Sequence, residues 1–214
     1  MHFWRTHWFD LGALLALPLA AWLYAHRAGL PTIQLILGLN LLALLLHQAE
    51  EYRWPGYFPG MLNAALYRSA APDRYPLNPQ TALLVNVGIG WVSYALAAVF
   101  YQQAPWLGIA TVLVSVGNVA AHTLLFNLKG RTWYNPGLDT ALLLFLPLAI
   151  WFSRILLTQH LATPAQWATG VAAGAALNYL GILKLIDWLA DADTPFRFER
   201  RQLRPEDRVG GYPD

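Results

Sequence analysis

The sequence predicts an all-α fold, a six-helix transmembrane bundle with an interfacial segment between the second and third helices. Hydrophobic residues make up 57% of the 214-residue chain and charged residues only 12%, against about 25% charged in an average soluble protein. The apolar residues gather in six stretches close to the roughly 20 residues that a membrane-spanning helix needs. A proline precedes five of these stretches, where a helix tolerates the missing N–H.

The six predicted helices run over Phe9–Ala25, Pro31–Glu51, Thr81–Tyr101, Trp106–Leu128, Leu138–Ile155 and Ala165–Ala190. The first could also be read as a cleaved signal peptide, but its apolar run is longer than usual for one, so we expect a retained helix. Residues 1–190 would then form one transmembrane domain. Residues 191–214 would form a charged cytoplasmic tail, whose alternating charges predict a solvated segment.

Basic residues in the loops predict the orientation of the bundle. The side that holds both termini and the second and fourth loops carries eleven of them: Arg5, Arg53, Arg68, Arg74, Lys129, Arg131, Arg197, Arg200, Arg201, Arg204 and Arg208. The opposite side carries only Arg27 and Arg154. Because Lys and Arg concentrate on the cytoplasmic side, we expect an inner (plasma) membrane protein with both termini in the cytoplasm. The charge balance gives no indication of nucleic-acid binding.

The second loop, from about Tyr52 to Gln80, is long and rich in aromatic residues. Within it, Met61–Ser69 is expected to form a short helix at the membrane interface, since tyrosine and tryptophan favour the depth of the headgroups.

Polar side chains gather near the predicted cytoplasmic ends of four helices: His47, Glu50, Glu51, Asn86, Asn118, His122 and Asp139. Helical periodicity puts His47 and Glu51 on one face of the second helix, with Glu50 to one side, and puts Asn118 and His122 on one stripe of the fourth. A carboxylate that faced hydrocarbon would cost several kcal/mol. The sequence therefore predicts that these faces meet in one buried polar pocket.

A divalent cation would stabilise two glutamates in such a pocket. The predicted ligands are His47, Glu50, Glu51 and His122, a set that suits zinc, iron or manganese. Asn86 and Asn118 are expected to support the site or simply to join helices, and Asp139 and Asn135 remain open as members of it. The chain contains no cysteine, which excludes thiolate ligands and nucleophiles.

The motif His47-Gln48-Ala49-Glu50-Glu51 resembles the signature of the HXXEE family of polytopic membrane proteins. Asn118 and His122 are similar to an Asn-x-x-x-His element of that family, and Trp133–Thr140 is similar to its Asn-Pro-Gly segment. The resemblance implies that these residues form one functional unit. It implies no activity, because the function of the family is unknown.

Three functions fit these residues. The first is a metal-dependent enzyme in which a glutamate that does not bind the metal, Glu50 or Glu51, acts as general base. Hydrolysis or iron-dependent oxidation is the expected chemistry. The substrate would be a membrane lipid or another amphipathic molecule from the cytoplasmic leaflet, with Arg53 or Arg131 holding an anionic head.

The second function is a metal-free acid–base isomerase or cyclase of an isoprenoid or sterol-like lipid. The third is metal transport or sensing, but the outer halves of the helices carry almost no polar groups, which counts against a path through the membrane. A polar cluster that only locks helix packing is the structural alternative to all three.

Overall fold

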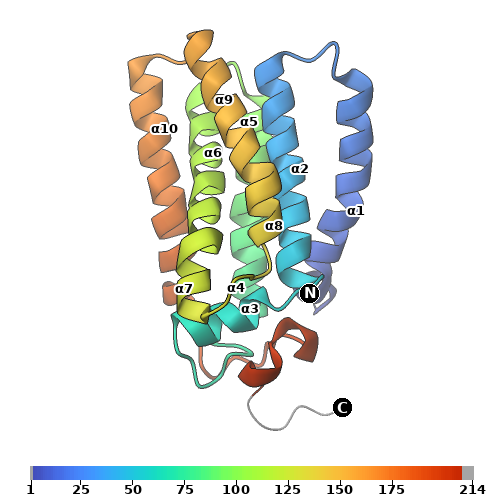
Figure 1. The fold of residues 1–214 in the computed structure, drawn as a ribbon, viewed down its shortest axis with the longest axis vertical. Helices are drawn as coiled ribbons and strands as arrows, with labels where there is room; N and C mark the ends of the chain where they lie inside the picture. Colours follow the sequence, from blue (N-terminus) through green and yellow to red (C-terminus); the bar gives the residue numbers. More distant parts are fainter. Residues whose placement is uncertain (1, 209–214) are drawn as a thin grey trace.

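The computed structural model describes residues 2–208, and within this range it contains helices and no strand (Figure 1). Six helical rods have the length and apolar composition of membrane spans: span 1 (Phe3–His26), span 2 (Thr32–Tyr52), span 3 (Pro79–Val99), span 4 (Pro105–Gly130), span 5 (Leu138–Thr158) and span 6 (Pro164–Trp188). The fold class predicted from the sequence is confirmed. Every predicted helix is present, and the largest shift is at the first, which begins several residues earlier than expected.

The spans are built from the following elements: α1 (His2–His26), α2 (Thr32–Tyr52), α4 (Pro79–Leu83), η2 (Leu84–Trp91), α5 (Val92–Val99), α6 (Pro105–Ala120), η3 (Ala121–Leu125), α7 (Phe126–Gly130), α8 (Leu138–Thr140), η4 (Ala141–Phe145), α9 (Leu146–Thr158), α10 (Pro164–Ala176), η5 (Leu177–Lys184) and α11 (Leu185–Trp188). The η segments here are π-helical turns. Spans 3 to 6 each contain one, and such widened turns often occur at functional sites.

Local sequence explains where several spans begin. Proline occupies the first turn of spans 3, 4 and 6. Asn78 caps span 3, its Oδ1 accepting hydrogen bonds from two backbone N–H groups, and Thr163 caps span 6 in a capping box with Gln166. The first turn of span 5 has no such side-chain cap of its own. Two of its free N–H groups donate instead to a carboxylate of span 2.

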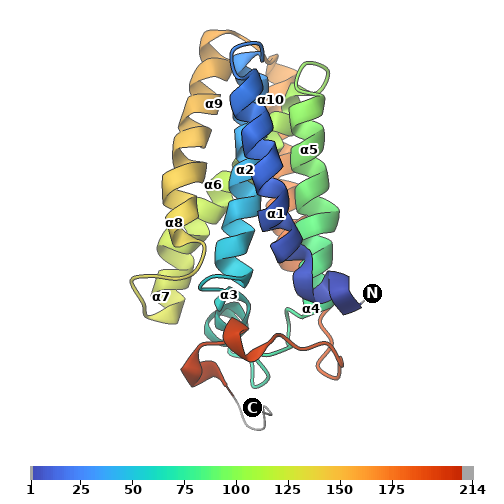
Figure 2. The ribbon, with the colours of Figure 1, turned by 90° about the vertical axis from the view of Figure 1, so that its right-hand side faces the viewer.

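Span 2 lies at the centre of the bundle and packs against spans 1, 3, 4 and 5 (Figures 1 and 2). More than half of its apolar window is buried, against 17% for span 6, which packs mainly on span 4. The central position explains why span 2 can bury polar residues: on most of its faces they meet another helix instead of lipid.

The polar stripes of spans 2 and 4 face each other in the middle of the bundle, as the sequence predicts. Asn40 accepts a hydrogen bond from Ser115 at 2.9 Å, and Tyr94 of span 3 shares a second bond with that serine at 2.9 Å. These buried bonds fix the rotation of three spans relative to one another.

The segment after span 2 and the tail close one end of the bundle, below the spans in Figures 1 and 2. The second loop forms a short helix, α3 (Phe58–Met61) continued by η1 (Leu62–Leu66), close to the helix predicted there. The tail carries the short turns η6 (Arg200–Gln202) and η7 (Pro205–Asp207). We call the end of the bundle that these segments close the tail end.

The part of the tail that the structure describes is not exposed along its whole length. Phe198 and Leu203 are buried in the same cluster as Met61. Arg201 and Gln202 donate hydrogen bonds to the carbonyl of Tyr52, at the C-terminal end of span 2. The last carbonyls of a helix are free acceptors and carry partial negative charge, so a guanidinium is a suitable partner for them.

Glycines allow span 6 to approach span 4 closely. A Cβ at Gly170 would stand 2.6 Å from the Cβ of Ile109, and one at Gly174 would stand 2.9 Å from the Cβ of Leu113. Small residues permit such contacts between membrane helices, where packing rather than the hydrophobic effect drives association.

Replacement of Gly170 by valine should therefore separate spans 4 and 6. We expect a loss of about 1–3 kcal/mol, typical of an overpacked contact, measured as a lower unfolding temperature in detergent. Gly181→Ala in the same span is the control, because a Cβ there meets its nearest neighbour at 3.7 Å. Equal stability of the two variants would contradict the close contact.

Candidate metal centre

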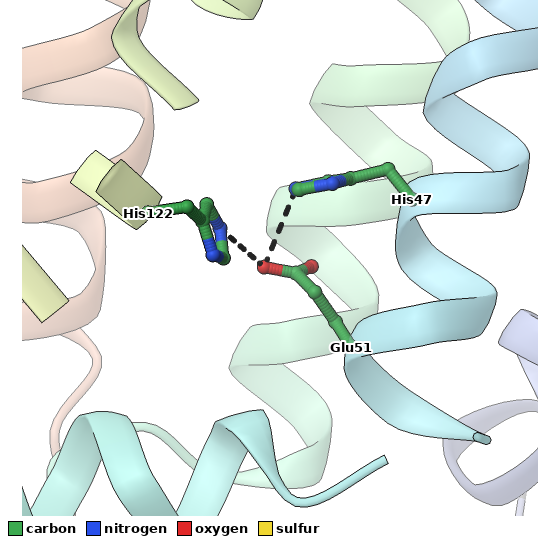
Figure 3. A group of neighbouring side chains, drawn as sticks. All are labelled: His47, Glu51 and His122. Carbon is green, nitrogen blue, oxygen red and sulfur yellow. Dashed lines mark ion pairs between the residues drawn. The ribbon is translucent and has the colours of Figure 1, made fainter. Parts of the chain in front are cut away.

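Three side chains from spans 2 and 4 converge inside the tail half of the bundle (Figure 3). Oε1 of Glu51 lies 3.5 Å from Nε2 of His47 and 3.3 Å from Nε2 of His122. All three residues are buried, and the three ligand atoms lie within 4.8 Å of one another. The spacing i, i+4 on span 2 aims His47 and Glu51 at one point, and the π-helical turn of span 4 supplies His122.

A hydrogen bond to Thr140 fixes the ring of His47. The Thr140 hydroxyl lies 2.6 Å from Oε2 of Glu50 and 2.8 Å from Nδ1 of His47. The hydroxyl has one proton, which it donates to the carboxylate of Glu50. Thr140 therefore accepts the bond from His47, which places a proton on Nδ1 and leaves the lone pair of Nε2 directed at Glu51.

Asn135 fixes the tautomer of the second imidazole, that of His122, in the same way. Its Nδ2 donates to the carbonyl of His122 and to Oδ1 of Asn127, both at 2.8 Å. Its Oδ1 must then be the atom that lies 2.5 Å from Nδ1 of His122, and an oxygen can only accept there. His122 is thus protonated on Nδ1 and also presents a bare Nε2.

Gly137 lets the loop before span 5 contact both imidazoles. Its φ of +104° suits glycine, and a Cβ there would stand 2.3 Å from Cε1 of His122 and 2.8 Å from Cε1 of His47. The segment Asn135-Pro136-Gly137 therefore has two functions, since its asparagine orients one ring and its glycine makes room for both.

The structure places Glu50 outside the group of three. Its carboxylate accepts four hydrogen bonds, from the Tyr134 hydroxyl, the backbone N–H groups of Asp139 and Thr140, and the Thr140 hydroxyl, at 3.0, 3.3, 2.9 and 2.6 Å respectively. It thereby caps the first turn of span 5, where the helix dipole favours an anion. A turn of 100° per residue separates the faces of Glu50 and Glu51, so the expectation that Glu50 also binds the metal or acts as the base is not supported by the geometry.

The group of three has the properties of a cation site. Two bare imidazole nitrogens and a carboxylate oxygen face one another, and neither Nε2 atom has a hydrogen-bond partner among residues 2–208. Three acceptors without a donor repel one another unless a positive charge lies between them. In a tetrahedral site with bonds of about 2.0–2.2 Å, neighbouring ligands stand about 3.3–3.6 Å apart, close to the two distances found here. The buried group could therefore hold a metal ion.

The other predicted residues lie around the group. Asn118 and Asn86 both line an apolar cavity beside the group. Asn86 also forms hydrogen bonds with Gln48 and Tyr52. The side chain of Asp139 is exposed, and only its backbone reaches Glu50. The guanidinium of Arg53 forms an ion pair with Asp10 of span 1 at 3.1 Å.

An apolar cavity of about 230 Å³ adjoins the group. Its walls come from spans 2, 3, 4 and 6, with His47 and Glu51 on one side, and its floor at the tail end includes Phe58 and Leu62. On spans 3 and 6 several lining residues are partly exposed on the outer face of the bundle, among them Ile89 and Leu183. Spans 3 and 6 therefore form the wall of the cavity that lies nearest the outer surface of the bundle.

Fold and site together define a helical membrane protein with a buried His–Glu–His group. The family model described as "Protein of unknown function with HXXEE motif" matches residues 38–152. The chain therefore belongs to this family, and the resemblance inferred from the motif is confirmed. None of the curated proteins and none of the solved structures matches the chain.

Sequence reasoning did not single out Thr140 or Gly137. Both lie in the segment Trp133–Thr140, whose Asn-Pro-Gly core was the available signal. A threonine or a glycine at the start of a membrane helix has no distinctive chemistry. Their contacts with His47 become visible only when span 5 is placed beside span 2.

The hydrogen-bond pattern predicts which nitrogen of each ring is protonated. We expect nitrogen-15 NMR of selectively labelled histidine to show a proton on Nδ1 of both His47 and His122. In metal-free Thr140→Val the Nδ1 of His47 loses its acceptor, so the proton should move to Nε2, where it can bond to Glu51. Thr140→Ser keeps the hydroxyl and should keep the wild-type spectrum. A wild-type His47 protonated only on Nε2 would contradict this assignment.

Proposed function

We propose that the protein is a metal-dependent membrane enzyme, with a divalent transition metal held by His47, Glu51 and His122. The observation that carries the proposal is the pair of buried Nε2 atoms, both without a hydrogen-bond partner among the described residues and both directed at Oε1 of Glu51. Two imidazoles and one carboxylate are ligands that suit zinc, iron or manganese.

The contacts around the ligands support the proposal. Metal-binding histidines usually donate their second ring nitrogen to a carboxylate, carbonyl or similar acceptor. Here Asn135 accepts a hydrogen bond from His122, and Thr140 accepts one from His47 and donates one to Glu50. A cluster that only joined helices would not need both rings in the same tautomer with bare nitrogens facing a carboxylate.

Three protein ligands leave a position for water or substrate, which is the pattern of catalytic rather than structural sites. A bound metal lowers the pKa of a water molecule or polarises a substrate oxygen, so hydrolysis is the reaction that we propose first, with iron-dependent oxidation as the second. The Glu50 carboxylate accepts four hydrogen bonds. Its role in this proposal is to position Thr140, which in turn orients His47. Glu51 is the only one of the two glutamates in contact with the site.

The adjoining cavity supports a lipid substrate. Its lining is predominantly apolar, it reaches His47 and Glu51, and its wall on spans 3 and 6 includes residues that are partly exposed on the outer face. α3, η1 and the tail cover the tail end of the bundle. A hydrocarbon chain that enters sideways from the bilayer would reach the group without leaving an apolar environment. With the excess of basic residues at the tail end, we propose the cytoplasmic leaflet of a plasma membrane as its source.

Metal analysis of the purified protein tests the first part of the proposal. We expect roughly one zinc, iron or manganese ion per chain by mass spectrometry, lost in His122→Ala and Glu51→Gln because each removes a ligand. His26→Ala is the matched control, since His26 is exposed at the end of span 1. A stable wild-type protein without metal, after reconstitution with each ion, would refute this part and favour metal-free acid–base chemistry.

Filling the cavity tests the second part. Gly90 lines it, and a Cβ there has no neighbour closer than 3.6 Å, so Gly90→Leu should fold with its side chain in the cavity. We expect native mass spectrometry to show a lipid retained by the wild type and lost in this variant, with unchanged metal content. Gly88→Leu, at an exposed position of the same span, is the control. Lipid retention that is equal in all three proteins would refute the lipid pocket while leaving the metal site untouched.

A further inference from the structure

A second, polar pocket of about 440 Å³ lies at the tail end and shares no lining residue with the apolar cavity beside the His–Glu–His group. Its lining comes from the end of span 4, the following loop and the tail. Four arginines contribute to it, Arg131, Arg201, Arg204 and Arg208, together with the hydroxyl-bearing residues Tyr57, Thr132 and Tyr134. The cavity beside the metal group contains no arginine or lysine, so the two pockets differ in chemistry.

Two of these guanidinium groups contain a nitrogen without a partner. Nη2 of Arg201 and Nε of Arg208 are buried and make no hydrogen bond among the described residues. Every guanidinium nitrogen carries a proton at neutral pH, and a buried donor of a charged group without an acceptor is costly. Both residues line the polar pocket. An acceptor that enters the pocket would remove this cost.

The charges that line the pocket leave an excess of positive charge. Arg204 is paired with two carboxylates, Asp207 and Glu206, and Glu206 also lines the pocket. Arg201 is paired with Glu199 at 2.6 Å, so these three carboxylates and the four arginines together leave one positive charge in excess. For Arg131 and Arg208 the structure shows no carboxylate partner within residues 2–208. The occupant is therefore expected to be an anion, and the planar fork of arginine matches the oxygens of a phosphate group.

The tyrosines add neutral donors to these cations. Burial is the main reason that the pKa of Tyr57 lies above its ordinary value, and for Tyr134 burial and the nearby Glu50 act in the same direction. Both hydroxyls therefore stay protonated at neutral pH. Tyr134 uses its proton for Glu50, whereas the Tyr57 hydroxyl makes no hydrogen bond that the structure records among the described residues.

We propose that this pocket binds a phosphate group, supplied by an anionic lipid headgroup or by a soluble phosphorylated molecule. Arg131 and Arg208 provide the charge, and the unpartnered nitrogens of Arg201 and Arg208 provide the donors. The lipid source is favoured by position, because Gly130 and Arg131 mark the end of span 4, where a spanning helix leaves the hydrocarbon and meets the headgroups. The proposal does not depend on the metal site.

Binding of matched probes to the protein in phosphatidylcholine nanodiscs tests the proposal. The probes are short-chain phosphatidic acid, the diacylglycerol with the same chains, glycerol 3-phosphate and inorganic phosphate. We expect phosphatidic acid to bind more tightly than diacylglycerol, which can enter the apolar cavity but offers no phosphate group to this pocket. In Arg131→Gln/Arg208→Gln the affinity should fall at least about tenfold, since two charge-assisted contacts are lost. Arg154→Gln, at the exposed far end of span 5, is the control.

The outcomes separate the two sources. Phosphatidic acid that binds far more tightly than glycerol 3-phosphate identifies a lipid headgroup, whereas equal binding of the soluble phosphates identifies a soluble ligand. Either result supports a phosphate site if the double variant weakens it. Binding that is absent, or equal in the wild type and the double variant, overturns the proposal. An unfolding temperature equal to that of the wild type would show that the double variant is folded and that only this pocket has changed.

Discussion

The carboxylate of Glu50 makes the interaction on which the site depends. It receives the first free N–H groups of span 5 and the hydroxyl of Thr140, so it joins the end of span 2 to the start of span 5. A buried carboxylate needs such compensation, and the first turn of a helix needs acceptors. One contact satisfies both requirements. It also places Thr140 against His47, and the loop before span 5 against both imidazoles.

The spacing of the motif follows from this arrangement. His47 and Glu51 are four residues apart and share a face, so both reach the interior between spans 2 and 4. Glu50, one residue earlier, is rotated by about 100° and reaches span 5 instead. Two adjacent glutamates are therefore not interchangeable. One is surrounded by hydrogen-bond donors, and the other faces only the lone pairs of two rings.

Much of the fold and part of the site could be predicted from the sequence, for physical reasons. Apolar stretches define membrane spans because the thickness of the bilayer sets their length, and helical period decides that His47, Glu51 and His122 point inward. The sequence could not separate the roles of Glu50 and Glu51, since this depends on which span lies beside each face. The docking of Leu203 was also missed, because one apolar residue in a charged tail gives no periodic signal.

The different surroundings of the two glutamates favour a cation beside Glu51 more strongly than the spacing of the motif does. Had the rings been free to choose their tautomer, one Nε2–H could have donated to Glu51, and the three groups would have formed an ordinary hydrogen-bonded cluster. Asn135 and Thr140 remove that freedom, because each offers only an acceptor to a ring Nδ1. Each ring can then gain an Nε2 proton only by becoming a buried cation itself. The contacts among the three groups therefore require either a proton, carried by the Glu51 carboxyl or by an imidazole, or a metal ion. Only the metal ion uses both bare nitrogens at once.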